Sequence, residues 1–125
     1  MNNTFCAPVI HGRRLGRKLG FPTINQTPPE SFAILPRGVW FSRCEIDGVS
    51  YPAVSNLGIK PTVQSDGELI CETYIFMDAR ELYGLHVTTT LIQFRRGEVR
   101  FESVDELAKM LAADIAAAKE YFGLC

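Results

Sequence analysis

The segment HGRRLGRKLGFPTIN, residues 11–25, combines residue types that suit the binding of a polyanion. It interleaves glycines and cations: Gly12, Gly16, Gly20, Arg13, Arg14, Arg17 and Lys18. A glycine-rich backbone offers free N–H groups, and the cations add the positive charge that the phosphates of a nucleotide require. The same composition is typical of a solvated hairpin loop, and the spacing alone does not separate the two interpretations.

Thr23 and Asn25 carry neutral side-chain oxygens at the end of this segment. Pro22 favours an extended backbone, in which residues two apart point to the same side. Two such oxygens suit a hard cation such as Mg²⁺ that is held mainly by nucleotide phosphates and water, although a hydrogen-bonded turn is an equal alternative. Arg17 and Lys18 would reach a phosphate only if the loop closed over it, and otherwise they are solvated surface cations.

Glu72 interrupts the apolar run LICETYIF, residues 69–76. A carboxylate in the middle of a strand needs a partner or a function. If Glu72 lines a cavity, it can accept a proton from a substrate hydroxyl; if it faces water, it belongs to the polar side of an amphipathic strand.

Phosphoryl transfer to an alcohol needs bound nucleotide phosphates, Mg²⁺ and a carboxylate that deprotonates the hydroxyl. The glycine-rich segment, the pair Thr23 and Asn25, and Glu72 match these three parts. The sequence lacks the P-loop pattern G-x-x-x-x-G-K-[ST] and the protein-kinase patterns H-R-D and D-F-G. A different scaffold is therefore implied.

The chain has 125 residues and a net charge of −1, which fit a single domain over residues 1–125. Residues 1–29 hold four of the thirteen Lys and Arg and no acidic residue, so the charge asymmetry is local and indicates a site. The four cysteines have no C-x-x-C spacing, and we expect unpaired thiols in a reducing compartment. Without a signal-peptide pattern or a run of roughly 20 apolar residues, we expect a cytoplasmic protein with no membrane partner.

Strand patterns separated by turn signals predict a small barrel or sandwich. Two short extended segments are expected at 5–10 and 21–25, a hairpin at 38–46 and 49–59 through Asp47-Gly48, and further strands at 68–77 and 85–94. Residues 26–37 contain three prolines and are expected to be irregular. A capping box from Ser103 to Glu106, followed by apolar residues at spacings of three and four, predicts a C-terminal helix that ends near Gly123.

Six segments, in order along the chain, resemble the riboflavin kinase (flavokinase) family, the kinase module of bacterial bifunctional riboflavin kinase/FAD synthetases. They are GRRLGRKLGFPTIN, LPRGVW, SNLGIKPT, ETYIFM, ELYG and FRRGEVRFESVDELAKMLAADI. The resemblance implies a mainly β fold, a six-stranded antiparallel Greek-key β-barrel with a C-terminal α-helix packed on it. It also implies transfer of the γ-phosphate of ATP to the ribityl 5′-hydroxyl of riboflavin, giving FMN and ADP, with Mg²⁺ or another divalent cation.

The resemblance assigns roles to individual positions. Glu72 is the expected catalytic base, and Thr23 and Asn25 are expected to contact the metal ion and the phosphates. The nucleotide-binding residues are expected to be Gly12, Arg17, Thr23, Asn25, Ile75, Met77 and Tyr83, and the flavin-binding residues Arg96, Val99 and Phe101. By residue type alone, Phe101 is equally a core residue at the start of the helix, and Arg96 a cation of a solvated turn.

Three positions depart from the family pattern: Ala7-Pro8 in the first strand, Tyr74 two residues after the expected base, and Gly97 after Arg96. None of them removes a catalytic group. The alternative function is a non-catalytic flavin- or nucleotide-binding module on the same barrel. We expect no nucleic-acid binding, because the chain is acidic overall and no basic stripe extends beyond residues 13–18. A monomer is expected, and FAD synthesis is not.

Overall fold

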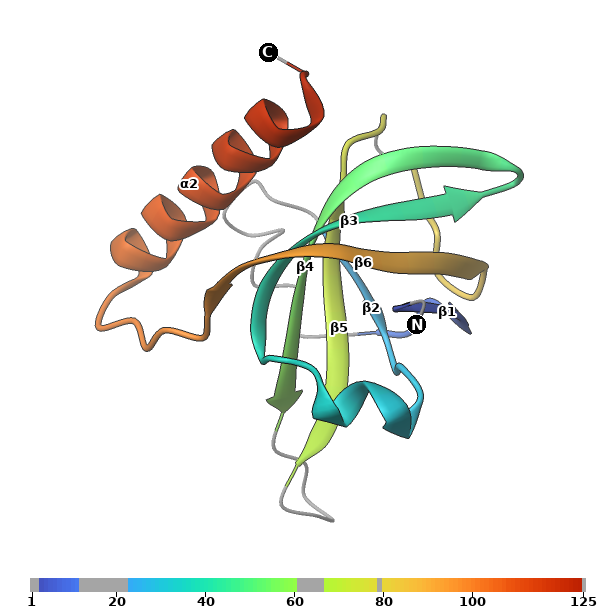
Figure 1. Cartoon of the computed structure of the whole chain (residues 1–125), viewed down its shortest axis with the longest axis horizontal. Coiled ribbons are helices and arrows are strands. Elements are labelled where there is room, and N and C mark those ends of the chain that lie inside the picture. Colours follow the sequence, from blue (N-terminus) through green and yellow to red (C-terminus); the bar gives the residue numbers. More distant parts are fainter. Residues whose placement is uncertain (1–2, 12–22, 61–66, 79, 125) are drawn as a thin grey trace.

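The computed structural model describes residues 3–11, 23–60, 67–78 and 80–124. The elements are β1 (Thr4–Pro8), β2 (Ile24–Gln26), the 3₁₀ helix η1 (Glu30–Ile34), β3 (Gly38–Ile46), β4 (Val49–Lys60), β5 (Glu68–Ile75), β6 (His86–Gly97) and α2 (Val104–Phe122). In Figure 1, α2 lies on one side of the strands, and β1 and the N-terminus lie on the other side.

The strands form a six-stranded antiparallel sheet in the order β1-β6-β3-β4-β5-β2. Because β6 returns beside β3 after the consecutive strands β3, β4 and β5, the connection is a Greek key. The two edges of the sheet approach each other at a bridge, where the Ile10 N–H donates to the Asn25 carbonyl at 2.8 Å. The sheet is thus a nearly closed barrel, and the predicted barrel with a C-terminal helix is confirmed.

The hairpin of β3 and β4 forms as the Asp47-Gly48 signal predicts. Both turn residues have positive φ, 51° at Asp47 and 80° at Gly48, as a type I′ turn requires. Ile46 then pairs with Val49 as the first residues of the ladder. The local turn chemistry therefore fixes the register of the two central strands.

Residues 26–37 are more ordered than predicted, because they include η1. Phe32 of η1 is buried, and its ring meets that of Phe5 edge to face at 5.1 Å. The Trp40 indole N–H donates to the Pro36 carbonyl at 3.0 Å and holds the end of the segment. Tertiary packing of one aromatic residue, which no local pattern displays, orders this turn against the end of the barrel.

The barrel interior alternates between apolar and polar levels. The inward residues are Trp40, Ser42 and Cys44 on β3, Ala53, Ser55 and Leu57 on β4, Cys71, Thr73 and Ile75 on β5, and Val87, Thr89 and Leu91 on β6. The middle residue of each strand carries a hydroxyl, and these hydroxyls pair with one another or with Gln26 at 2.6–2.8 Å. Buried hydroxyls are tolerated in a core when they are hydrogen-bonded. These hydroxyls form a polar belt between two apolar clusters.

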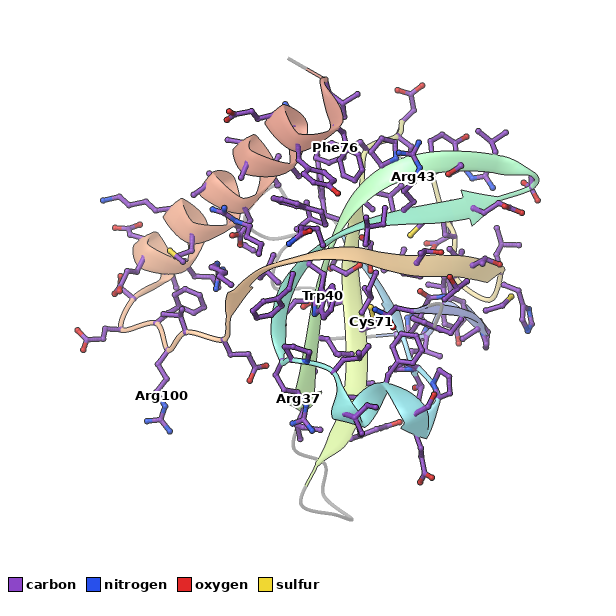
Figure 2. All side chains as sticks on the ribbon, viewed as in Figure 1. Arg37, Trp40, Arg43, Cys71, Phe76 and Arg100 are labelled. Carbon is purple, nitrogen blue, oxygen red and sulfur yellow. The ribbon has the colours of Figure 1, made fainter. Side chains whose placement is uncertain are left out.

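The predicted helix caps are confirmed at both ends of α2. The Ser103 side chain accepts from the Glu106 N–H at 3.1 Å, and Gly123 ends the helix with a left-handed φ of 70°. The helix packs through Ala118 on the outer face of the barrel, against Val39, Phe41 and Val54. Figure 2 shows Phe76 between the strands and the C-terminal half of the helix.

Within the described ranges, no helix combines the length and the apolar character needed to cross a membrane.

Gly38 is a position where any side chain would be costly. Its φ is 137°, and an added Cβ would overlap the Arg96 carbonyl oxygen and the Gly97 backbone. We expect Gly38→Ala to lower the free energy of unfolding by roughly 2–4 kcal/mol, because the new Cβ would clash with backbone atoms of β6, which cannot rotate away as a side chain can. The control is Gly48→Ala, where φ is also positive but no described atom beyond the chain neighbours lies within 4 Å; we expect a loss of about 1 kcal/mol. Equal losses in urea unfolding would contradict the clash.

The buried thiols should make stability fall at alkaline pH. Burial raises the pKa of Cys44 from 9.0 to about 12 and that of Cys71 from 9.0 to about 11. Above pH 9 the thiols ionise in the unfolded chain but stay protonated in the folded chain. The free energy of unfolding therefore has its full value below pH 9 and declines above it. We expect a loss of roughly 1 kcal/mol per pH unit per thiol between pH 9 and 11.

Urea unfolding at pH 8 to 11 measures this loss, and Cys44→Ala removes the contribution of one thiol. A variant with the same pH dependence as the wild type would show that the buried thiols are not responsible.

Candidate active site

The register of β2 and β5 brings the expected metal ligands beside the expected base. Asn25 pairs directly with Glu72, so their side chains leave the same face of the sheet. One residue before β2, Thr23 donates its hydroxyl hydrogen to Oε2 of Glu72 at 3.0 Å. Because the residues on either side of Glu72, Cys71 and Thr73, point into the barrel, Glu72 projects from the outer face, where its side chain is 22% exposed.

Asn25 holds a buried acceptor that has no partner among the described residues. The residue is 4% exposed, and Oδ1 makes no hydrogen bond to the described residues. A buried acceptor without a partner is costly and indicates a missing donor or cation. In the described part of the chain, no group of three or more His, Cys, Asp and Glu side chains is arranged to hold a metal ion. A cation at Asn25 would therefore need most of its ligands from a bound molecule or water.

Lys60 is a further charged residue at this point, and the sequence analysis did not assign it a role. Its Nζ lies 3.6 Å from Oε1 of Glu72, so Lys60 and Thr23 each hold one carboxylate oxygen. The pair is partly exposed and contributes little to stability, but it fixes the orientation of the carboxylate. Strand alternation in the sequence places Lys60 on the same face as Asn56, but the pairing of Asn56 with Glu72 is visible only in the structure.

Arg96, Val99 and Phe101 line a cavity of about 460 Å³ between the barrel and α2, which we call the Arg96 cavity. Thr23, Lys60 and Glu72 line the same cavity from the barrel side, and Leu107, Leu111 and Asp114 from the helix. The structure therefore brings the three expected flavin-binding residues together with the expected base. The apolar wall and the cations suit a planar ring that carries polar atoms at its edge.

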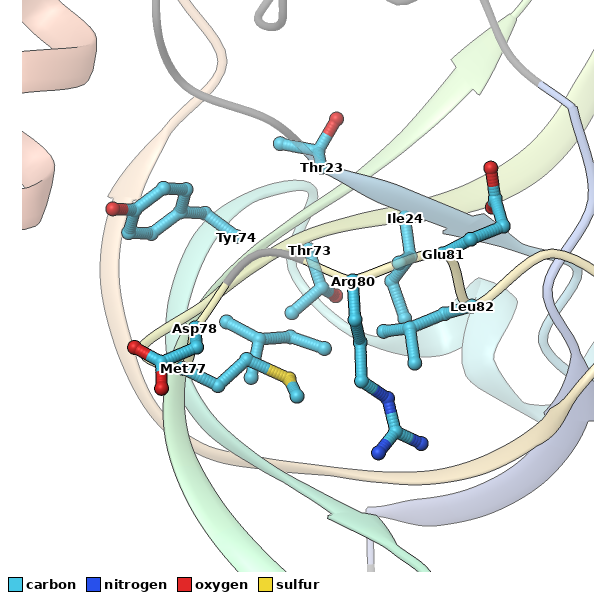
Figure 3. A pocket seen from close by; sticks show the side chains of 10 residues that line it. Thr23, Ile24, Thr73, Tyr74, Met77, Asp78, Arg80, Glu81 and Leu82 are labelled. Carbon is cyan, nitrogen blue, oxygen red and sulfur yellow. The ribbon is translucent and has the colours of Figure 1, made fainter.

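Ile75 and Met77 line a second cavity, of about 420 Å³, which we call the Met77 cavity. Figure 3 shows Ile24, Met77 and Leu82 around it, with the guanidinium group of Arg80 beside them. Its mostly apolar wall suits a heterocyclic base, and the charged groups of Asp78, Arg80 and Glu81 lie along its lining.

Tyr83, which was expected in the same group, lines a smaller neighbouring cavity of about 40 Å³. Its ring stacks on His11 at a centroid distance of 3.8 Å. Gly12 and Arg17 lie outside the described residues.

Thr23 connects the two large cavities, since it lines both of them. A molecule in the Met77 cavity and another in the Arg96 cavity would therefore meet beside its hydroxyl, 3.0 Å from the Glu72 carboxylate. This arrangement fits the transfer of a group between two bound molecules, with a carboxylate at their meeting point.

Comparison with known proteins identifies the family. The sequence model of the riboflavin kinase (flavokinase) family matches residues 2–122. A bifunctional riboflavin kinase/FMN adenylyltransferase of Pseudomonas fluorescens is 39% identical over 111 residues, which are 89% of this chain and 35% of that protein. The RNA-binding riboflavin kinase RibR of Bacillus subtilis is 34% identical over 116 residues, which are 93% of this chain and 50% of that protein.

Among solved structures, a riboflavin kinase from Trypanosoma brucei superposes with a TM-score of 0.65 over 96% of this chain and 79% of that chain. At 18% identity this likeness supports the fold alone. The chain belongs to the riboflavin kinase family. It spans about a third of the length of the Pseudomonas protein and half that of RibR.

Proposed function

We propose that the chain is a riboflavin kinase, which transfers the γ-phosphate of ATP to the ribityl 5′-hydroxyl of riboflavin and releases FMN and ADP. The observation that carries this proposal is the meeting of two cavities at Thr23, whose hydroxyl contacts Glu72 at 3.0 Å. Membership of the family supports the same reaction.

In this proposal the flavin ring lies in the Arg96 cavity and the nucleotide in the Met77 cavity. Val99, Phe101, Leu107 and Leu111 supply apolar contacts to the ring, and Arg96 supplies hydrogen-bond donors. Ile75 and Met77 contact the base of the nucleotide. Tyr83, next to Leu82 of the Met77 cavity, borders the nucleotide, and Gly12 and Arg17 belong to its phosphate-binding segment.

Thr23 and Asn25 would hold the divalent cation, Mg²⁺ or another. The unpartnered, buried Oδ1 of Asn25 fits this role, because a neutral oxygen is a ligand that Mg²⁺ accepts beside phosphates. When bound, Mg²⁺ neutralises phosphate charge and orients the γ-phosphate.

Glu72 acts as the general base in the proposed reaction. It takes the proton of the 5′-hydroxyl while the oxygen forms a bond to the γ-phosphorus; the bond from this phosphorus to the β–γ bridging oxygen breaks, and ADP leaves. Thr23 and Lys60 keep the carboxylate oriented toward the meeting point.

We also propose that residues 1–125 form a single riboflavin kinase domain that works in the cytoplasm as a monomer and binds no nucleic acid. Among the described cysteines, Cys6, Cys44 and Cys71 are free thiols, as in a reducing compartment. The acidic net charge of −1 argues against a nucleic-acid partner. RNA binding is stated for RibR by its name, and a salt-dependent oligonucleotide titration would detect such binding in this chain.

Replacing Glu72 by Gln should reduce turnover far more than substrate binding. The amide keeps the shape of the side chain but cannot accept the proton, so we expect kcat to fall by about 10²–10⁴-fold while both KM values change by less than about threefold. FMN formation from riboflavin and Mg-ATP, followed by chromatography, measures the change.

Glu45→Gln is the matched control, because it removes an equal charge from an exposed position on β3. A rise of both KM values with little change in kcat would assign Glu72 to binding. Flavin and nucleotide binding by the wild type without FMN formation under any divalent cation would instead support the non-catalytic module.

Replacing Asn25 by Ala should weaken use of the cation while leaving the flavin site intact. We expect the Mg²⁺ concentration for half-maximal activity to rise by about tenfold or more, because one protein ligand is lost. Riboflavin binding without nucleotide should stay unchanged, and calorimetry with ADP should show the loss only when Mg²⁺ is present. An equal loss of ADP affinity without Mg²⁺ would place Asn25 on the nucleotide itself.

A further inference from the structure

Asp114 is a buried carboxylate on α2 that contacts two consecutive arginines at the end of β6. Its side chain is 3% exposed. Arg96 binds it in a bidentate manner, with Nε 2.9 Å from Oδ1 and Nη2 2.7 Å from Oδ2, and Arg95 donates from Nε to Oδ1 at 2.9 Å. Bidentate, charge-assisted bonds of this kind fix the plane of a guanidinium group as well as its position.

A β-bulge lets both arginines reach the same carboxylate. Along the β3–β6 ladder Val39 pairs with Arg96 and Trp40 with Phe94, so Arg95 has no partner opposite it. In a regular strand consecutive side chains point to opposite faces, and the extra residue of a bulge breaks this alternation. The backbone of β6 is therefore shaped so that Arg95 and Arg96 both turn toward α2.

The backbone around Arg96 is held as firmly as its side chain. Gly38 brings β3 so close to the Arg96 carbonyl and to Gly97 that no side chain fits between them. The Arg96 Nη1 group also donates to the Gly97 carbonyl at 3.0 Å. Arg96 is thus fixed through its own strand, the neighbouring strand and the helix.

This fixed pair forms part of the wall of the Arg96 cavity, since both Arg96 and Asp114 line it. A guanidinium group has five N–H donors. Asp114 and Gly97 engage three of those on Arg96, and among the described residues the other two, one on each terminal nitrogen, have no partner. A neutral heterocycle with carbonyl and ring-nitrogen acceptors suits donors whose charge is compensated and whose direction is set.

We propose that Asp114 is a positioning residue for flavin binding that acts through Arg96. The contact that docks α2 on β6 then also sets the direction of the donors that bind the flavin ring. This inference rests on the proposed function, because it takes the ligand of the Arg96 cavity to be riboflavin. Asp114 does not touch the reacting atoms; it sets the direction of the Arg96 donors.

The test is a double-mutant cycle of Asp114→Asn, Arg96→Gln and the double variant, with Glu120→Gln as the control for charge on an exposed part of α2. Quenching of riboflavin fluorescence gives Kd without any turnover, and steady-state assays give KM for ATP. We expect Asp114→Asn to raise Kd for riboflavin by about tenfold or more, as for loss of a charge-assisted hydrogen bond. In Asp114→Asn, KM for ATP should change by less than about twofold. In Glu120→Gln, both Kd for riboflavin and KM for ATP should change by less than about twofold.

The cycle distinguishes positioning from a general structural role. If Asp114 acts through Arg96, the double variant binds riboflavin as Arg96→Gln does, and the two losses do not add. Additive losses, an unchanged Kd in Asp114→Asn, or an equal rise of KM for ATP would each overturn the proposal.

If Asp114→Asn does not fold, the comparison of the double variant with Arg96→Gln decides. The double variant removes both charges of the Arg96–Asp114 pair, and the charge that loses its carboxylate, that of Arg95, is partly exposed. Equal Kd values support the proposal, and a further loss overturns it. If the riboflavin Kd values show the expected non-additive losses but the wild type forms no FMN, the proposed kinase activity alone is refuted. FMN formation with a Kd insensitive to Asp114 would refute this inference alone, and a wild type that does not bind riboflavin would refute both.

Discussion

The barrel closes at β2, and the buried amide of Gln26 holds this short strand in place. The backbone of β2 pairs with β5 on one side, and on the other side it meets the chain at the Ile10–Asn25 bridge. Gln26 spans the rest of the gap, donating to the Ala7 and Val87 carbonyls at 2.9 and 2.8 Å and accepting from Thr89 at 2.6 Å. Because Asn25 precedes Gln26, the contact that closes the interior also holds Asn25 outward, opposite Glu72.

The same alternation divides the strands into a structural face and a chemical face. On β5, Thr73 points inward to the polar belt and Glu72 points outward to the Arg96 cavity. A slip of one residue in register would exchange the two, which would bury an unpaired carboxylate in the barrel. The inward hydroxyls fit only one register, since each needs its partner on the next strand. The packing of the interior therefore determines where the outward functional groups stand.

The sequence was most informative where the physics is local. The Asp47-Gly48 turn and the Ser103 cap depend on the backbone preferences of a few consecutive residues, which short segments reveal. The contact of Thr23 with Glu72 joins residues 49 positions apart, and only the family resemblance placed both residues in one site. The burial of Phe32 and the bulge at Arg95 depend on distant packing, so neither η1 nor the contact of Arg95 with Asp114 was predicted. Asp114 had a visible signal, because it falls between Leu111 and Ala118 on the buried face of α2, where a charge is unexpected.

That position also separates two explanations of the arginine cluster. If α2 needed only to dock, an apolar residue at 114 would continue the row of Leu107, Leu111 and Ala118, and such replacements of buried ion pairs are often neutral or stabilising. The chain instead buries a carboxylate there and bends β6 with a bulge so that Arg95 and Arg96 both reach it. Stability gives no reason for this combination. A cavity wall that must present fixed donors explains this combination. Without Asp114, Arg96 would place a desolvated, unpaired cation beside a neutral ring, so its charge has to be compensated before its remaining N–H groups can bind that ring.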